Sequence, residues 1–384
     1  MKRIRRRWPH ARGSMNRAVA ALLLLPLPLL ATSCGNGPQV TSTGGPTAGS
    51  LVAVGKMTIG RSLHTATLLP TSEVLLTGGG TPDLPATRSV EIFDPATGLT
   101  RRAGDMKVAR AEHTATLLAD RTVLIVGGLG PAANSAEIYD PASESSTFVG
   151  PLTEPRSDHV AVQLDDGHVL ILGGDISGVG ATPTAGAELY DPVTGTFTPT
   201  GRMSIARAPF GVVRLPDGRI LVAGGTTTGK QVVASAEIYD PGTGQFTSTG
   251  SLLTTRRKHA GAVLSDGTVL IMGGTTDRTD STVLQSAESF DPATGRFQAS
   301  AAMRSPRFKF TAVSLPDGSI LVAGGSEETV EVFDPRAGQF RAVANGQQGL
   351  RLFPTATLLA DGSVLIAGGY SGNGSQPTLW RYAP

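Results

Sequence analysis

The sequence contains a single cysteine and few aromatic or charged residues. Phe, Trp and Tyr make up 5% of the 384 residues, and Asp, Glu, Lys and Arg make up 17%. Because Cys34 has no second cysteine to pair with, the fold must be held by packing and hydrogen bonds alone. Glycine and proline are abundant instead, with 49 and 26 copies. This composition is typical of many short strands joined by tight turns.

The body of the chain also lacks an excess of positive charge. The formal net charge of +2 depends on seven basic residues in the first 33 positions, which contain no acidic residue. The rest of the chain has 26 basic and 31 acidic residues. A mildly acidic body has no basic surface for phosphate groups, so we expect no nucleic-acid partner.

The basic N-terminus is followed by a short apolar run, "AVAALLLLPLPLLATSC", at residues 18–34. This order predicts a secretory signal peptide over residues 1–33, with a start at either Met1 or Met15. The end of the run, "ATSC", resembles a bacterial lipobox, which implies cleavage before Cys34 and lipidation of that residue. The alternative is an ordinary cleaved signal with an incidental cysteine.

Residues 34–49 are rich in Gly, Ser, Thr and Pro and carry no charge, so we expect a flexible tether. Together with the lipidated cysteine, this predicts a protein secreted across the inner membrane. It would be lipid-anchored in the bacterial cell envelope, at the outer membrane or the cell surface.

No window of the remaining chain has a helical period, but glycine doublets recur every 44 to 51 residues. Each doublet ends an apolar run, and a fixed period of this size is typical of repeat architectures. The seven doublets begin at Gly78, Gly127, Gly173, Gly224, Gly273, Gly324 and Gly368.

Each unit predicts four antiparallel strands. A turn such as "PDG" (216–218) joins two apolar runs into a hairpin, the second run being "RILVAGG" (219–225). After a variable loop, "AEIYDP" (236–241) gives a third strand and "TGQFTSTG" (243–250) a fourth. The pattern therefore predicts an all-β fold, a seven-bladed β-propeller over residues 50–384.

The glycine doublet, the aromatic-Asp-Pro strand and the "R-x-x-H" entry together resemble the kelch repeat. The form is similar to that in bacterial proteins related to the propeller domain of galactose oxidase. One departure concerns the fourth strand, where the family's usual tryptophan is replaced by Phe or Leu, as at Phe197, Phe246 and Phe297.

The last unit ends at "LWRYAP" (379–384), which matches a third strand. The first segment of the body, "SLVAVGKMTIGR" (50–61), matches the end of a unit such as "FTPTGRMSIAR" (197–207). We therefore expect the N-terminal strand to complete the last blade, which removes two free sheet edges.

An arginine precedes the first strand of every unit, and three residues later comes a position that is most often histidine. We interpret the histidines as packed structural residues, because Phe210, Phe310 and Pro354 take the same position elsewhere. The alternative is a metal-binding or catalytic role. The arginines are Arg61, Arg110, Arg156, Arg207, Arg256, Arg307 and Arg351, and the histidines are His64, His113, His159 and His259.

A glutamate recurs in the third strand of six units. We expect each to pair with an arginine of the repeat, because carboxylate and guanidinium match in bidentate geometry. A residue copied six times is a poor candidate for a unique catalytic group. These residues are Glu91, Glu137, Glu188, Glu237, Glu288 and Glu331.

Residues unique to single units are the candidates for a ligand-binding face. They follow the glycine doublets or lie at the entrances of the fifth and sixth units. The alternative is that they are solvated loop residues. They are Asp175, Lys230, Arg257, Lys258, Asp277, Arg278, Phe308, Lys309, Glu327, Glu328 and Tyr370.

The resemblance to galactose oxidase does not extend to its copper site. That family implies two tyrosines, two histidines and a cysteine joined to one tyrosine. Here the one cysteine is Cys34, and no "Tyr-His" pair occurs. We expect no copper, no other cofactor and no catalytic residues of that type.

These observations favour a non-enzymatic module of the cell envelope, which binds a partner or acts as a scaffold. It would present one propeller face to a protein or glycan partner, with the membrane contacted through Cys34. The alternative is a glycan- or sugar-acting enzyme at the mouth of the channel. The fold alone does not decide between them. Perturbed acidic groups or histidines converging at one channel mouth would favour the enzyme.

Overall fold

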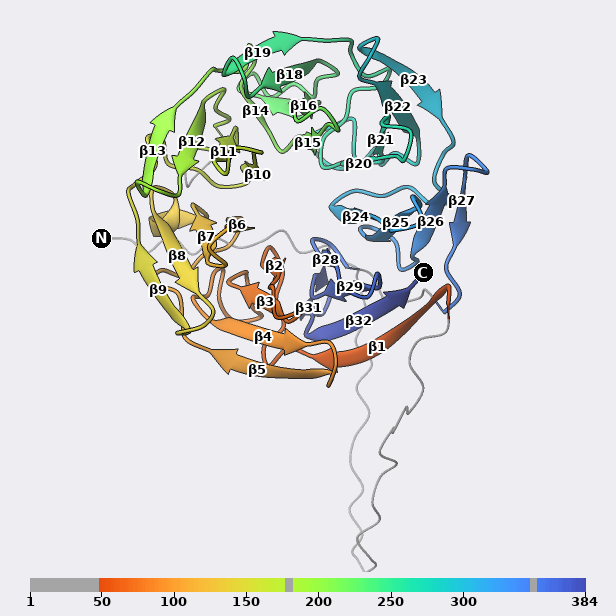
Figure 1. Ribbon diagram of the computed structural model, residues 1–384. Coiled ribbons are helices and arrows are strands. Elements are labelled where there is room, and N and C mark those ends of the chain that lie inside the picture. Colours follow the sequence, from red (N-terminus) through yellow and green to blue (C-terminus); the bar gives the residue numbers. More distant parts are fainter. Residues whose placement is uncertain (1–47, 177–181, 346–350) are drawn as a thin grey trace, which may run out of the picture. The chain divides into compact units, whose positions relative to one another are not determined.

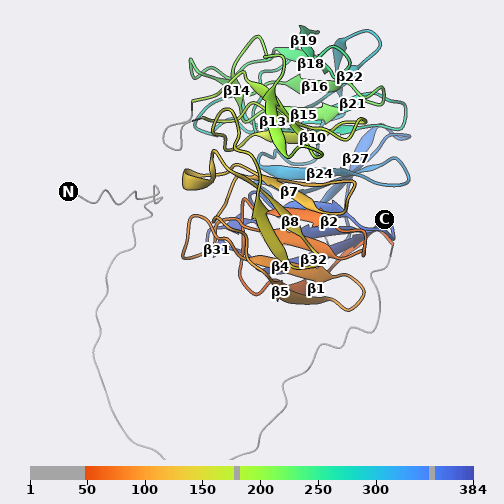
Figure 2. The same cartoon turned by 60° about the vertical axis from the view of Figure 1, so that its left-hand side comes forward.

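The computed structural model describes residues 48–176, 182–345 and 351–384. Within them, seven sheets of four antiparallel strands are arranged in a ring (Figures 1 and 2). The predicted all-β, seven-bladed propeller is therefore confirmed. The predicted signal peptide, most of the tether and Cys34 lie outside the described residues. No described helix has the length and apolar character needed to cross a membrane.

In each blade the strands follow chain order from the centre outward, except in the last. Blade 1 is β2 (Thr65–Leu68), β3 (Val74–Thr77), β4 (Val90–Asp94) and β5 (Leu99–Ala103). Blade 2 is β6 (Thr114–Leu117), β7 (Val123–Val126), β8 (Ala136–Asp140) and β9 (Ser145–Phe148). Blade 3 is β10 (Val160–Gln163), β11 (Val169–Leu172), β12 (Ala187–Asp191) and β13 (Thr196–Pro199). Blade 4 is β15 (Gly211–Arg214), β16 (Ile220–Ala223), β18 (Ala236–Asp240) and β19 (Gln245–Ser248).

Blade 5 is β20 (Ala260–Val263), β21 (Val269–Met272), β22 (Ala287–Asp291) and β23 (Arg296–Ser300). Blade 6 is β24 (Phe310–Ser314), β25 (Ile320–Gly324), β26 (Glu331–Asp334) and β27 (Gln339–Ala342). Blade 7 is β28 (Thr355–Leu358), β29 (Val364–Ala367), β32 (Thr378–Ala383) and β1 (Ser50–Lys56). Loop elements are the strand pairs β14 (Arg207–Ala208) with β17 (Thr226–Thr227) and β30 (Tyr370–Ser371) with β31 (Gly374–Ser375), and a 3-10 turn at Gly130–Ala132.

The ring closes as predicted, by the N-terminal strand. β1 pairs with β32 over its whole length, with Ser50 opposite Ala383 and Lys56 opposite Thr378 (Figure 1). Leu51 is buried in the same cluster as Tyr382 of β32. Hydrogen bonds and apolar packing thus tie the first described strand to the last.

The hydrophobic core is divided among the seven junctions between blades. The second strand of every blade is buried, so its side chains pack against both neighbouring sheets. One cluster combines Leu75 and Ile92 of blade 1 with Ile125 and Tyr139 of blade 2. Equivalent clusters join every other neighbouring pair, including blades 7 and 1. No blade can therefore bury its apolar faces alone.

The fourth strands correct one prediction. Facing aromatic rings do occur in four blades, and their centroids lie 4.7–4.9 Å apart in the pairs Tyr190–Phe197, Tyr239–Phe246, Phe290–Phe297 and Phe333–Phe340. In blade 7 the equivalent residue is Leu51. In blades 1 and 2 it is Thr100 and Ser146, so the expected Phe or Leu is wrong there. Ser146 instead donates a hydrogen bond of 2.5 Å to Glu137.

Each entry arginine connects several segments of its blade. The guanidinium of Arg110 donates to the carbonyl of Gly127, the carbonyl of Ser135 and the carboxylate of Glu137. The guanidinium of each of the seven entry arginines donates a hydrogen bond to the carbonyl of the first glycine in the doublet of its own blade. The six predicted pairs with glutamates are present, with N–O distances of 2.6–2.9 Å. Their side chains are at most 3% exposed, so bulk water does not screen them.

The second oxygen of each glutamate holds the loop that carries the arginine. Glu137 accepts a hydrogen bond from the main-chain N–H of Lys107, three residues before Arg110. The other five glutamates accept an equivalent bond from the same loop of their own blades. One carboxylate thus fixes both the arginine side chain and its backbone.

Blade 7 has no glutamate at this position. Its register places Trp380 opposite Ile366, where Glu188 lies opposite Ile171 in blade 3. The guanidinium of Arg351 lies 6.0 Å from the centroid of the Trp380 ring. A cation–π contact therefore takes the position of the ion pair.

The two glycines of each doublet allow neighbouring blades to approach closely. A Cβ atom at Gly127 would lie 2.5 Å from the carbonyl oxygen of Arg156 and 2.8 Å from the ring of His159, both in the next blade. Gly128 donates a hydrogen bond to that same arginine carbonyl. Both glycines have positive φ, of 62° and 116°. The doublet is therefore needed for backbone conformation and for blade-to-blade contact.

We predict that Arg207→Met lowers the free energy of unfolding by about 3–5 kcal/mol, because it leaves Glu237 buried without its cation. The measurement is urea denaturation of the purified protein. Arg101→Gln is the control, because Arg101 and Glu144 form an exposed pair and should lose less than about 1 kcal/mol. Equal losses in the two variants would contradict the proposed role of the buried pairs.

Candidate functional site

One residue of each blade lies immediately before the His/Phe/Pro position, and five of these seven residues line the mouth of the channel. In six blades it has a left-handed conformation, with φ between 53° and 57°. A side chain in that region costs about 1 kcal/mol that glycine would avoid. Such strain is often found at functional sites. The seven residues are Leu63, Glu112, Asp158, Pro209, Lys258, Lys309 and Phe353.

Backbone hydrogen bonds join these residues from blade to blade. The N–H of Glu112 donates to the carbonyl of Leu63, and that of Asp158 donates to Glu112. On the other side, Lys309 donates to Lys258 and Phe353 donates to Lys309. The side chains therefore project from a fixed frame and not from free loops.

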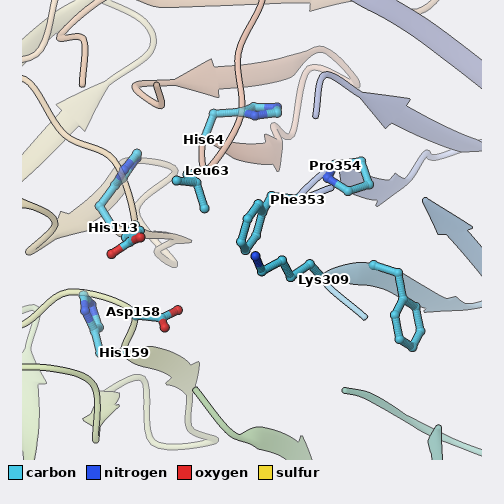
Figure 3. Close-up of a pocket in the computed structure, with 10 residues that line it drawn as sticks. Leu63, His64, His113, Asp158, His159, Lys309, Phe353 and Pro354 are labelled. Atoms are coloured by element: carbon cyan, nitrogen blue, oxygen red, sulfur yellow. The ribbon is translucent and has the colours of Figure 1, made fainter. Parts of the chain in front are cut away.

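The mouth is a cavity of about 230 Å³. It is lined by Glu112 and Asp158 on one side and by Lys309 and Phe353 on the other. Figure 3 shows the Asp158 carboxylate and the Lys309 ammonium group pointing into the space between them. A second hollow of about 370 Å³ continues along the inner strands, lined by Thr65, Thr114 and Thr355 among others.

The four repeat histidines are buried around this mouth, with 5–9% of each residue exposed. Burial, with a nearby arginine, lowers the pKa of His64, His159 and His259 to about 3. The pKa of His113 is lowered for the same reasons. All four are therefore neutral at pH 7.

Three of the histidines bond to the preceding blade. Their Nε2 atoms lie within 3.0–3.3 Å of a threonine hydroxyl, in the pairs Thr355–His64, Thr65–His113 and Thr114–His159. The fourth, His259, faces Gly211, where a Cβ atom would lie 2.3 Å from Nε2. These rings lie between blades, as packed residues would. Within the described segments, no group of His, Cys, Asp and Glu could hold a metal ion.

The carboxyl groups at the mouth have raised pKa values. Burial is the main cause for Asp158, and repulsion from Glu112 and Asp175 adds to it, so its pKa rises to about 8. Burial and Asp175 also raise the pKa of Glu112, and burial raises that of Asp175. Asp175 is thus the one predicted ligand-face residue on this side.

The opposite side combines lysines with aromatic rings. The Lys309 ammonium lies 5.1 Å from the ring centroid of Phe308 and 4.8 Å from that of Phe353. Lys258 lies 5.8 Å from Phe308 and donates a hydrogen bond of 2.6 Å to Asp280. Burial lowers the pKa of Lys258 to about 8, against the effect of that bond.

Two more predicted residues organise the loop beside these lysines. Arg257 donates to the carbonyls of Asp277 and Arg278 and to the carboxylate of Asp280. The Asp277 side chain accepts a hydrogen bond from the Thr279 hydroxyl and others from the backbone of its own loop, and these bonds lower its pKa. The Asp277 carboxylate therefore stabilises the conformation of its own loop.

The remaining predicted ligand-face residues lie away from the cavity lining. Lys230, Arg278 and Glu328 are exposed on the loops that follow the doublets, and Glu327 is half-buried. Tyr370, which is 47% exposed, begins β30. Of the predicted residues Lys309 lines the cavity, and Asp175, Lys258 and Phe308 lie next to its lining residues. Arg257 is joined to Lys258 and Lys309 through Asp280, and the others lie on surrounding loops.

The sequence interpretation missed Glu112, Asp158 and Asp280. Glu112 and Asp158 directly precede histidines of the repeat, and the interpretation considered only the histidines. Comparing the residue before that position in all seven units would have found them, because it is charged in four and differs between the two halves of the ring. Asp280 had no signal beyond its place in a variable loop.

We predict that the stability of the wild type falls between pH 5 and pH 8, because Asp158 has a pKa of about 8 when folded and 3.8 as its ordinary value. The folded state then binds the proton that the unfolded state has released, so raising the pH favours unfolding by roughly 1 kcal/mol per pH unit. In Asp158→Asn this loss should be smaller. The measurement is urea denaturation at several pH values. Asp83→Asn, in an exposed loop, is the control, and parallel curves for wild type and Asp158→Asn would contradict the assignment.

This chain is similar to a solved structure that is described as a novel fungal alcohol oxidase with catalytic diversity among the AA5 family, in complex with copper. The TM-score is 0.71 at 20% sequence identity, over 88% of this chain and 76% of the other. At this identity the likeness establishes the fold alone.

The residues at this mouth do not fit a copper centre of the galactose oxidase type. Tyr139, Tyr190, Tyr239 and Tyr382 are buried within the blades, and no tyrosine lines the cavity. His64, His113 and His159 direct Nε2 at threonines between blades.

The sequence comparisons agree with the fold. No curated protein is similar enough in sequence to count as a relative of this chain. The family model described as the Kelch motif matches residues 206–253 and 256–304. These matches run from the entry of blade 4 to the end of blade 5. The chain is therefore a kelch-motif protein with a seven-bladed β-propeller fold.

Proposed function

We propose that this protein is a binding module of the bacterial cell envelope, which presents the mouth of its channel to a segment of a partner protein. The observation that carries the proposal is the division of the mouth into a carboxyl side and a lysine side on one rigid frame. Groups of both signs can pair with a peptide, which carries both, better than with a neutral glycan.

The proposed location rests on the N-terminal sequence. The basic segment, the apolar run and "ATSC" at residues 31–34 support secretion and lipidation of Cys34. A tether without charge would then separate the propeller from the membrane. The module would face partners outside the inner membrane.

The rigid backbone of the mouth also supports binding. Four hydrogen bonds fix Glu112, Asp158, Lys309 and Phe353 before any partner arrives. Pre-organised side chains lose less conformational freedom on binding, so more of the contact energy appears as affinity.

A second candidate is favoured by one observation. Asp158 and Lys258 both have pKa values of about 8 and lie on opposite sides of one mouth, which is typical of groups that transfer protons. An enzyme acting on a sugar or glycan would use them as acid and base. Turnover of a bound sugar that is abolished in Asp158→Asn would favour this alternative over binding alone.

We predict that the full chain binds short peptides of mixed charge on a random peptide array. The triple variant Glu112→Gln, Asp158→Asn, Lys309→Met should lose at least about tenfold in affinity, because it removes charges of both signs from the centre of the interface. An array of neutral and acidic glycans is probed in parallel.

Lys56→Gln is the matched control for this array, because Lys56 is exposed on the outermost strand β1. It should bind as the wild type does. Binding to glycans alone, or peptide binding equal in the triple variant and wild type, would contradict the proposed function.

A further inference from the structure

The charges around the mouth are not balanced within either half. The acidic half consists of Glu112, Asp158 and Asp175, and the basic half consists of Arg257, Lys258 and Lys309. Glu112 and Asp158, on blades 2 and 3, line the cavity together with Lys309, on blade 6. Asp175, Arg257 and Lys258 lie behind these lining residues.

The acidic half contains no bonded cation. None of its three carboxyl groups forms an ion pair with another described residue, and one oxygen of Asp175 is buried without a hydrogen-bond partner. Arg110 and Arg156, the nearest arginines in sequence, are occupied by Glu137 and Glu188. A cation placed among the three carboxyl groups would relieve the repulsion between them.

The basic half has three cations and one carboxylate. Asp280 pairs with Arg257 and Lys258 at 2.6 Å each, and lies 3.7 Å from Lys309. The side-chain ammonium of Lys309 donates no hydrogen bond to any described residue, and it lies over the rings of Phe308 and Phe353. This half therefore has two more positive charges than negative ones, and of its three cations Lys309 lines the cavity.

The wall between the halves is apolar. Leu63, Phe353 and Pro354 line the cavity beside the charged groups. Figure 3 shows Phe353 next to the Lys309 ammonium, with Leu63 on the side toward His64 and His113. An aliphatic segment that joins two charged ends could lie along this wall.

We propose that the mouth binds a small zwitterion, which places its ammonium group among Glu112, Asp158 and Asp175 and its carboxylate on Lys309. The inference deepens the proposed function, on which it rests, by naming the ligand class that occupies the centre of the face. An anion alone would leave the carboxyl groups without a cation, and an amine alone would leave Lys309 without an anion. A neutral sugar would compensate neither half.

The test is isothermal titration calorimetry of the full chain with ω-amino acids of increasing length, from glycine to 8-aminooctanoate. The series varies the separation of the two charges and so measures the width of the mouth. Hexanoate and hexylamine carry one charge each and serve as ligand controls. At one chain length the ω-amino acid should bind at least about tenfold more tightly than either, because both ends are then paired.

Two variants assign the ends of the ligand. In Lys309→Met the best ω-amino acid should lose most of its advantage in affinity over hexylamine. In Asp158→Asn it should lose most of its advantage in affinity over hexanoate. Lys56→Gln on the outermost strand and Glu73→Gln on the turn between β2 and β3 are the matched controls, and both should bind as the wild type does. Equal binding in all four variants would overturn the proposal.

The outcomes also separate this inference from the proposed function. If no ω-amino acid binds better than hexanoate and hexylamine, the zwitterion site is wrong. The proposed function would still stand if the peptide array depends on the mouth charges. If neither the array nor the ω-amino acids depend on those charges, both are wrong.

Discussion

The buried arginine before the first strand of each blade is the interaction on which the rest of the fold depends. Its guanidinium bonds to the first doublet glycine of its own blade, and in six blades to the glutamate of the third strand. In six blades its main-chain carbonyl accepts the N–H of the second doublet glycine from the preceding blade, as Arg61 does from Gly369 where the ring closes. One residue thus joins the strands of a blade and also joins that blade to its neighbour.

This arrangement explains why the chain folds without a disulfide. Each apolar cluster is shared by two blades, so a blade that loses its neighbour exposes its core. The pairing of β1 with β32 makes the ring continuous and leaves no blade without a partner on either side. The first and last strands of the propeller therefore contribute Leu51 and Tyr382 to the core between blades 6 and 7.

The repeat in the sequence was sufficient to predict the strands, the number of blades, the closure of the ring and the arginine–glutamate pairs. Each of these depends on residues or segments whose pattern recurs from unit to unit. Thr100 and Ser146 were not predicted, because one face of a fourth strand tolerates several residue types. Glu112 and Asp158 were missed for a different reason. Their importance comes from facing Lys258 and Lys309 across the ring, and a distance between blades is not contained in the period of a repeat.

The same frame that makes the blades alike also displays their differences. A single backbone position, repeated seven times, carries two carboxylates, two lysines and three apolar residues, and so divides the mouth into halves of opposite charge. Because the backbone there is held by blade-to-blade hydrogen bonds, the charges cannot move apart to relieve repulsion. Burial is the main cause of the raised pKa of Asp158, and repulsion from Glu112 and Asp175 adds to it.

The measurement that tests this account most directly is a carboxyl-carbon NMR titration of the full chain labelled at aspartate, with Asp158→Asn used to assign the signal. The account predicts that Asp158 titrates near pH 8, and that an ammonium-bearing ligand shifts this titration to lower pH. Titration at the ordinary aspartate value of about 4 would contradict it, because the mouth would then contain a cation or enough water to stabilise the charge.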